Sequence, residues 1–190
     1  MSNDTNIFER VFKLWAKIAM LIVEGKRDPH KIADVLQKIL ETSDLLRFLA
    51  TVNLLAITGW NAKKAFTTGK WYLGSDFENN FVIDKDVDVP TVALRTQELI
   101  RGSRDEGIRV ELGAELEEIQ LGQFHSFLMT QADHSKWYVA YIKDKNGKLW
   151  AVDAFWHDGG WSVFATSVGH PSDWGAGRVI VSRDPGTLGQ

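Results

Sequence analysis

The chain of 190 residues contains no cysteine and only 4 prolines. The absence of cysteine excludes disulfide bonds, thiolate ligands for metals and cysteine nucleophiles, and it fits a reducing compartment. Long hydrophobic runs are also missing, because the longest, from Ile18 to Val23, is far shorter than the roughly 20 residues that span a bilayer. The start of the chain, MSNDTNIFER, lacks the basic and apolar regions of a signal peptide. We therefore expect a cytoplasmic protein without a membrane span.

Charge of neither sign dominates the whole chain, whose net charge is -3. Charged residues make up 25% and hydrophobic residues 44% of the sequence, which is typical of a globular domain. Residues 76–118 nevertheless hold twelve acidic and five basic side chains. This acidic middle argues against a continuous groove for nucleic acid, and we predict that nucleic acid is not the partner.

The N-terminal two thirds of the sequence has mainly helical periodicity. Apolar residues recur at three- and four-residue steps over 7–24 and again over 29–40, with Asp28 as the expected N-cap of the second helix. These two segments predict a helical hairpin. Further helices are expected over 92–101 and 123–134, a short strand at 71–73, and little other regular structure between 43 and 83.

The C-terminal third has the pattern of a sheet. The stretch WYVAYIKDKNGKLWAVDAFW holds two strand-like runs around Asn146-Gly147, a pair that suits a type I′ turn with positive φ at both residues. A third run, WSVFATSV, follows HDGG, and a fourth covers 178–182. We predict one α+β domain over residues 1–190, with a helical part over about 7–135. An antiparallel meander of three to four strands is expected over about 136–183.

Three motifs also suggest a relationship to other proteins. GKRDPHKIADVLQKIL near the start, YLGSDFENNF in the middle and SVGHPSDWGAGRVIVSRD near the end resemble a family of small uncharacterised bacterial proteins. The resemblance extends over residues 15–184 and implies one intact domain. It assigns no activity and no functional residue.

One stretch, DAFWHDGGW at 153–161, allows two interpretations. In the first, Asp153, His157 and Asp158 form a catalytic or metal-binding group, to which His170 and Asp173 also contribute. In the second, Asp158 and the glycine after it form a two-residue turn, so that residue 157 pairs with residue 160 and two tryptophans face each other across the ladder. The turn leaves Asp153 unexplained, because an aspartate inside a strand is unusual.

Motifs for known cofactors are incomplete or missing. The run of Asp84, Asp86 and Asp88 lacks the glycine and the glutamate that an EF-hand loop requires. Gly175-Ala176-Gly177 precedes a strand-like run instead of a helix, which does not fit a dinucleotide-binding turn. The P-loop, GxSxG and HExxH patterns are absent. We therefore predict no cofactor and no metal.

Tryptophan is the unusual component, with 8 residues of which five lie from Trp137 onward. Its large ring suits both cores and contact surfaces. We predict a non-catalytic module that binds a protein or a small molecule through an aromatic-rich sheet. The expected contact residues are Trp156, Trp161, His170 and Trp174.

Two other functions remain open at this point. A hydrolase or nuclease would use Asp153, His157 and Asp158, and it requires Asp153, His157 and His170 to converge in an open pocket. Single-stranded nucleic-acid binding would stack bases on the aromatic rings of the sheet. Such platforms usually interleave arginine or lysine with the rings, whereas the lysines here lie at strand ends.

Overall fold

The computed structural model describes residues 13, 15–21, 23–26, 28–32 and 45–187, and internal contacts divide the chain into two units, residues 1–43 and 44–190. In the first unit, residues 15–21 and 29–32 are helical. The predicted N-terminal helical hairpin is not shown, because much of both helices lies outside the described residues. Among the described residues, no helix is long and apolar enough to cross a membrane. One domain over the whole chain remains a prediction.

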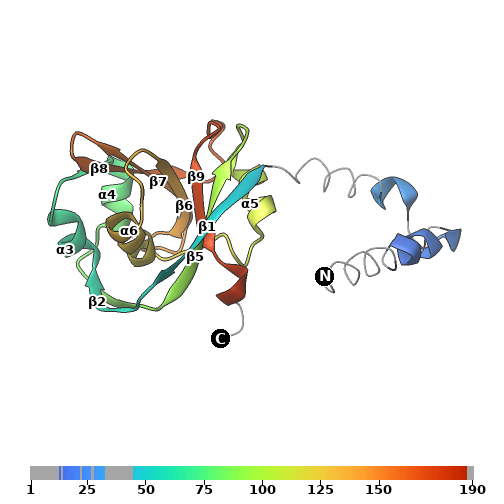
Figure 1. Cartoon of the computed structure of the whole chain (residues 1–190), viewed down its shortest axis with the longest axis horizontal. Helices are drawn as coiled ribbons and strands as arrows, with labels where there is room; N and C mark the ends of the chain where they lie inside the picture. The colour runs from blue at the N-terminus through green and yellow to red at the C-terminus, as the bar shows by residue number, and fades with distance from the viewer. Residues whose placement is uncertain (1–12, 14, 22, 27, 33–44, 188–190) are drawn as a thin grey trace. The chain divides into compact units, whose positions relative to one another are not determined.

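The second unit is built on a seven-stranded mixed sheet with the order β1-β5-β9-β6-β7-β8-β3 (Figure 1). Its strands, in chain order, are β1 (Leu46–Leu54), β3 (Trp71–Leu73), β5 (Val92–Leu99), β6 (Trp137–Lys143), β7 (Leu149–His157), β8 (Gly160–Ser167) and β9 (Val179–Arg183). Two further strands, β2 (Ile57–Asn61) and β4 (Asp86–Val89), form a separate antiparallel pair.

Helices cover both faces of the large sheet. One face carries α3 (Ala62–Thr67), α4 (Ser75–Phe81) and α6 (Leu121–Thr130), whose phenylalanines belong to the larger of two hydrophobic cores. The other face carries α5 (Asp105–Leu112) and the smaller core. A short 3-10 helix, η1 (Pro185–Thr187), follows β9. Figure 1 shows α4 and α6 on one side of the central strands and α5 on the other.

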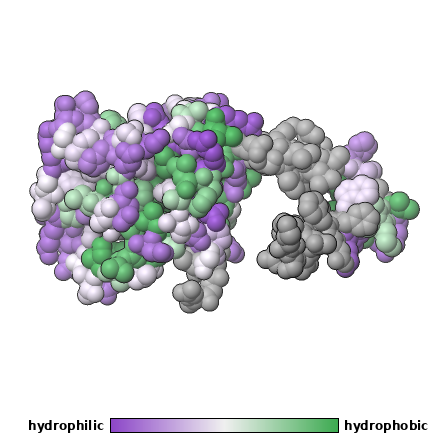
Figure 2. All heavy atoms as spheres, in the orientation of Figure 1, coloured by the Kyte–Doolittle hydropathy of each residue, from purple (hydrophilic) through white to green (hydrophobic). Residues whose placement is uncertain are grey.

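The period of two along the central strands decides which side chains meet which helices. On β6, Tyr138, Ala140 and Ile142 belong to the larger core, whereas Val139 and Tyr141 belong to the smaller one. The outer strand β1 has less cover and exposes Phe48 and Leu49. Figure 2 shows such hydrophobic surface interspersed with hydrophilic side chains.

The predicted C-terminal meander is wrong as a description of the sheet. The strands β6, β7 and β8 are antiparallel neighbours, but β9 passes both β8 and β7 and pairs with β6 in parallel. The sheet then continues through β5, which was predicted to be a helix, and through β1, which lies where little regular structure was predicted. Local patterns predicted the hairpins, whereas the place of β9 depends on contacts between residues far apart in sequence.

The predicted helix over 92–101 is also wrong, since β5 occupies most of this segment. Val92, Leu94 and Thr96 are buried in alternation, which is the period of a strand. A proline followed by threonine at 90–91 resembles a helix start, but pairing with β1 on one side and β9 on the other determines the structure. The helix expected over 123–134 is present as α6, and the strand expected at 71–73 is present as β3.

The turn between β7 and β8 confirms the second interpretation of DAFWHDGGW. Asp158 and Gly159 have φ values of 49° and 74°, and His157 pairs with Gly160. Positive φ at both central residues is the geometry of a type I′ turn. Within the described part of the chain, Asp158 is the only non-glycine residue with positive φ.

The turn between β6 and β7 differs from the predicted type I′ turn. Only Gly147 has positive φ, at 81°, and its N–H donates to the carbonyl of Asp144 at 3.0 Å. The N–H of Asp144 donates to the carbonyl of Lys148 at 2.8 Å. This is a type I turn followed by a residue in the left-handed region, the usual three-residue hairpin loop. Asp144 favours it, because its Oδ1 accepts the N–H groups of Asn146 and Lys148.

Of the two residues Asn146 and Gly147, we expect alanine to be costly only at Gly147. Gly147→Ala should lower the free energy of unfolding by about 1–2 kcal/mol, because an L side chain disfavours the left-handed region. Asn146→Ala is the matched control and should change it by less than about 0.5 kcal/mol. Urea unfolding of both variants measures the difference. Equal losses would support the type I′ turn instead.

Candidate functional site

An open pocket of about 500 Å³ lies on the face of the sheet that carries α5. We call it the aromatic basin. Side chains from β6, β7 and β8 form its floor, while the start of α5 and the segment between β8 and β9 form its wall. The lining residues are Asp105, Trp137, Asp153, Phe155, Phe164, Thr166, His170, Ser172, Asp173 and Trp174.

The floor of the basin follows from strand register. Trp137 pairs with Phe155 across β6 and β7, and Asp153 pairs with Phe164 across β7 and β8. The ring centroids of Trp137 and Phe155 are 4.4 Å apart, and those of Phe155 and Phe164 are 6.1 Å apart with nearly parallel planes. Phe164 is 41% exposed, so the floor presents aromatic ring surface to solvent.

Asp153 is the buried acid of this floor, with 4% of its surface exposed. The indole N–H of Trp137 donates to its Oδ2 at 2.8 Å. Burial raises the pKa of Asp153 to about 6, although the Trp137 hydrogen bond and the charge of Arg178 act in the opposite direction. Ion pairs within 4.0 Å join many carboxylates to cations in the described residues, but Asp153 is not among them.

A second buried acid, Asp105, begins α5 and lies in the wall. Its Oδ1 accepts the hydroxyl of Tyr141 at 2.9 Å and the indole N–H of Trp174 at 2.7 Å. Two backbone hydrogen bonds between Ser103 and Trp174 hold the wall segment beside α5. Burial, and after it the charge of Asp105, raises the pKa of Tyr141 above its usual range. Tyr141 therefore remains a neutral donor to Asp105.

Arg178 lies beside the basin, next to Trp137. Its guanidinium carbon is 3.3 Å from the centroid of the Trp137 ring, and its buried Nε has no hydrogen-bond partner among the described residues. Burial lowers the pKa of Arg178, and the charge of Asp153 opposes this effect. One face of the indole is therefore occupied by an internal cation.

The structure places the residues of the predicted catalytic group in two locations. Asp153, His170 and Asp173 line the basin. His157 and Asp158 lie in the β7–β8 turn, where their side chains are 66% and 73% exposed and 3.4 Å apart. Four residues of strand, about 13 Å at about 3.3 Å per residue, separate His157 from Asp153. Within the described residues, no three His, Asp or Glu side chains are grouped so that they could hold a metal ion.

The four predicted contact residues are also divided between locations. His170 and Trp174 line the basin. Trp156 and Trp161 face the larger core on the opposite side of the sheet, where Trp161 is 2% exposed. Trp156 stacks on His134 there, with ring centroids 3.8 Å apart.

Sequence reasoning missed several residues of the basin. Pairing of β6 with β7 places Trp137, Asp153 and Phe155 on one face, and the alternation of the two strands was a usable signal for this. Asp105 gave no comparable signal, because it reaches Tyr141 and Trp174 from a distant part of the chain.

We expect Asp153→Asn to stabilise the protein at neutral pH. The folded-state pKa of about 6 lies above the ordinary value of 3.8, so the ionised form is disfavoured by folding. The difference between these two pKa values corresponds to about 3 kcal/mol at pH 8, and asparagine can still accept the Trp137 N–H. The gain should decrease as the pH falls from 6 to 4, where Asp153 becomes protonated. Urea unfolding across this range measures it.

The difference in stability between the variant and the wild type reports on Asp153 alone. Burial also lowers the pKa of His125 to about 4, but His125 titrates equally in both proteins and its contribution cancels. Asp173→Asn is the matched control, because Asp173 lines the same basin with its side chain 61% exposed. A loss of stability in Asp153→Asn at every pH would contradict the expected cost of the buried charge.

Comparisons with protein-family models, with curated proteins and with solved structures found no match to this chain.

Proposed function

We propose that the chain is a non-catalytic, cytoplasmic ligand-binding module whose ligand is an organic cation held in the aromatic basin. One observation carries this proposal: the buried carboxylate of Asp153 lines the basin beside the exposed ring of Phe164, and among the described residues no cation lies within ion-pair distance of it. A positively charged ligand would supply the missing partner. It would also offset the cost of ionising Asp153 inside the protein.

The rings support the same ligand chemistry. Aromatic faces attract cations through their quadrupole, and the attraction strengthens where water is excluded. The exposed ring of Phe164 lies beside Asp153, and Trp174 lies at the wall. The carboxylate of Asp105 adds negative potential at this wall, whereas that of Asp173 forms an ion pair with Arg104 at 3.2 Å. The volume of about 500 Å³ falls in the range of small-molecule sites.

Acid–base catalysis is the second candidate function. A carboxyl with a pKa of about 6 in an open pocket suits proton transfer near neutral pH, and His170 lines the same pocket. A nucleophile or a polarised water would also be required. We favour binding, because His157 and Asp158, the other predicted catalytic residues, lie in the β7–β8 turn and do not line the basin.

Single-stranded nucleic acid fits the basin less well. The stack of Arg178 on Trp137 resembles a platform for bases. However, the carboxylates of Asp105 and Asp153 line the basin beside the rings and would repel phosphates. Binding through phosphate contacts would weaken steeply with added salt.

We expect benzylammonium to bind the wild-type protein with a dissociation constant on the order of 1 mM, as for a fragment with few atoms. Benzyl alcohol and benzoate have the same ring without the positive charge and should bind at least tenfold more weakly. Isothermal titration calorimetry at pH 7.5 measures all three. Affinity for benzylammonium should fall as the pH is lowered through 6, because Asp153 becomes neutral.

Two variants with matched controls connect this binding to the basin. Asp153→Asn and Phe164→Ala should each weaken benzylammonium binding at least fivefold. Asp173→Asn should have a smaller effect than Asp153→Asn, and Phe48→Ala, which removes an exposed ring outside the basin, should have none. Unchanged binding in Asp153→Asn, or equal affinity for benzoate, would contradict the proposal.

A further inference from the structure

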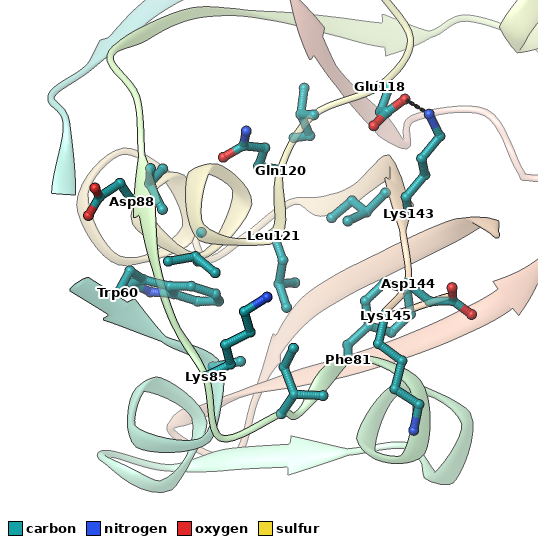
Figure 3. Close-up of a pocket in the computed structure, with 17 residues that line it drawn as sticks. Trp60, Phe81, Lys85, Asp88, Glu118, Gln120, Leu121, Lys143, Asp144 and Lys145 are labelled. Atoms are coloured by element: carbon teal, nitrogen blue, oxygen red, sulfur yellow. Dashed lines mark ion pairs between the residues drawn. The ribbon is translucent and has the colours of Figure 1, made fainter. Parts of the chain in front are cut away.

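A second pocket, of about 340 Å³, lies on the other side of the molecule from the α5 face, between the β2–β4 pair, the end of α4 and the start of α6 (Figure 3). We call it the β4 pocket. Apolar side chains form most of its walls, with Phe81 and Ile119 almost fully buried. The end of β6 closes one side through Ile142. The β4 pocket shares no lining residue with the aromatic basin.

The walls of the β4 pocket are fixed by close packing. Gly122, in the first turn of α6, has no room for a side chain, because a Cβ there would lie 2.4 Å from Cγ2 of Val89. The same Cβ would also lie 3.1 Å from the ring of Trp60. The helix and the β2–β4 pair are therefore in direct contact, so the β4 pocket does not depend on a loosely placed segment.

Three acidic residues line this pocket, and each already has a partner. Asp88 accepts the N–H of Gly59 at 2.9 Å, and Glu118 forms an ion pair with Lys143 at 2.7 Å. Asp144 accepts donors of its own hairpin, including the indole N–H of Trp150. Figure 3 shows the carboxylates of Asp88 and Asp144 pointing away from the centre of the pocket.

The lysines of the pocket differ from one another. Lys143 pairs with Glu118, and Lys145 donates to the carbonyl of Asn79 at 2.7 Å. Lys85 lies in the loop before β4, and within the described part of the chain no hydrogen bond or ion pair engages its amine. Figure 3 shows its side chain extending inward between Trp60 and Phe81, toward Leu121. The inner walls of the pocket are thus apolar, and the exposed Lys85 places at its mouth an amine that no hydrogen bond or ion pair of the described residues engages.

We propose that the β4 pocket binds an amphiphilic carboxylate, a medium-chain fatty acid. Its carboxylate pairs with the Lys85 amine, and its hydrocarbon chain covers the apolar walls. Both parts of the ligand are needed. An exposed ion pair alone contributes little to the binding free energy. Burial of the hydrocarbon chain contributes more, but it does not distinguish a negative head group from a positive one. The proposal is independent of the cation site, since it concerns other residues and the opposite charge.

Calorimetry with octanoate tests the proposal directly. Wild-type protein should bind octanoate at pH 7.5, at concentrations where octanoate is monomeric, whereas octylammonium should bind at least tenfold more weakly. Lys85→Gln should weaken octanoate binding at least fivefold. Lys63→Gln is the control for charge: it removes the same charge from a nearby exposed lysine that pairs with Asp84 outside the pocket lining, and it should leave binding unchanged. Equal weakening in both variants, or no weakening in Lys85→Gln, would overturn the proposal.

Two further variants separate the charge from the cavity. Lys85→Glu should reverse the preference, so that octylammonium binds better than octanoate. The fold should tolerate this change, because residue 85 is exposed and lies in a loop. Val87→Phe replaces a small side chain of the pocket wall with an aromatic ring, at a strand position that is 37% exposed. The ring should fill the pocket and abolish binding of both amphiphiles. Benzylammonium titration of the same variants reports on the aromatic basin separately. Octanoate binding that persists in Val87→Phe would indicate adsorption to the surface and would refute a site in this pocket.

Discussion

The register between β6 and β7 is the constraint on which both pockets depend. Trp137 pairs with Phe155 and Val139 pairs with Asp153, so the odd-numbered residues of both strands share the face with α5. A slip of one residue on either strand would move its whole set of side chains to the other face. Asp153 would then lie among the phenylalanines of the larger core. The β6–β7 turn fixes this register, and the Asp144 carboxylate holds the turn through the N–H groups of Asn146 and Lys148.

Local sequence patterns predicted the parts of the structure that depend on neighbouring residues. The turn at Asp158 and Gly159 was correct because left-handed backbone needs such residue types. The predicted type of the β6–β7 turn was wrong, because the side chain of Asp144 selects a three-residue loop that the Asn-Gly pair alone does not indicate. The sequence that begins at Pro90 resembled a helix start, but it leads into the strand β5, whose structure is explained by pairing with β1 and β9.

The candidate site was predictable to a similar extent. Asp153 stood out in the sequence because it interrupts a strand, and the structure places it in the floor of an open basin. His157 and Asp158, which are close to it in sequence, lie at the end of the strand. Trp174 and Asp105 meet through a hydrogen bond between segments 69 residues apart, which no local pattern reveals. The two buried acids therefore have different surroundings: Asp105 has two donors, and Asp153 has one.

The loop that joins β6 to β7 also has a consequence for the chemical ageing of the protein. Asparagine followed by glycine is prone to deamidation, because the backbone nitrogen of the glycine attacks the asparagine side chain to form a cyclic imide. Here that nitrogen donates to the carbonyl of Asp144, and the left-handed conformation of Gly147 holds the two residues in the turn. Imide formation would require this hydrogen bond to open first. The folded protein thus slows a reaction to which Asn146 would be exposed in an unfolded chain.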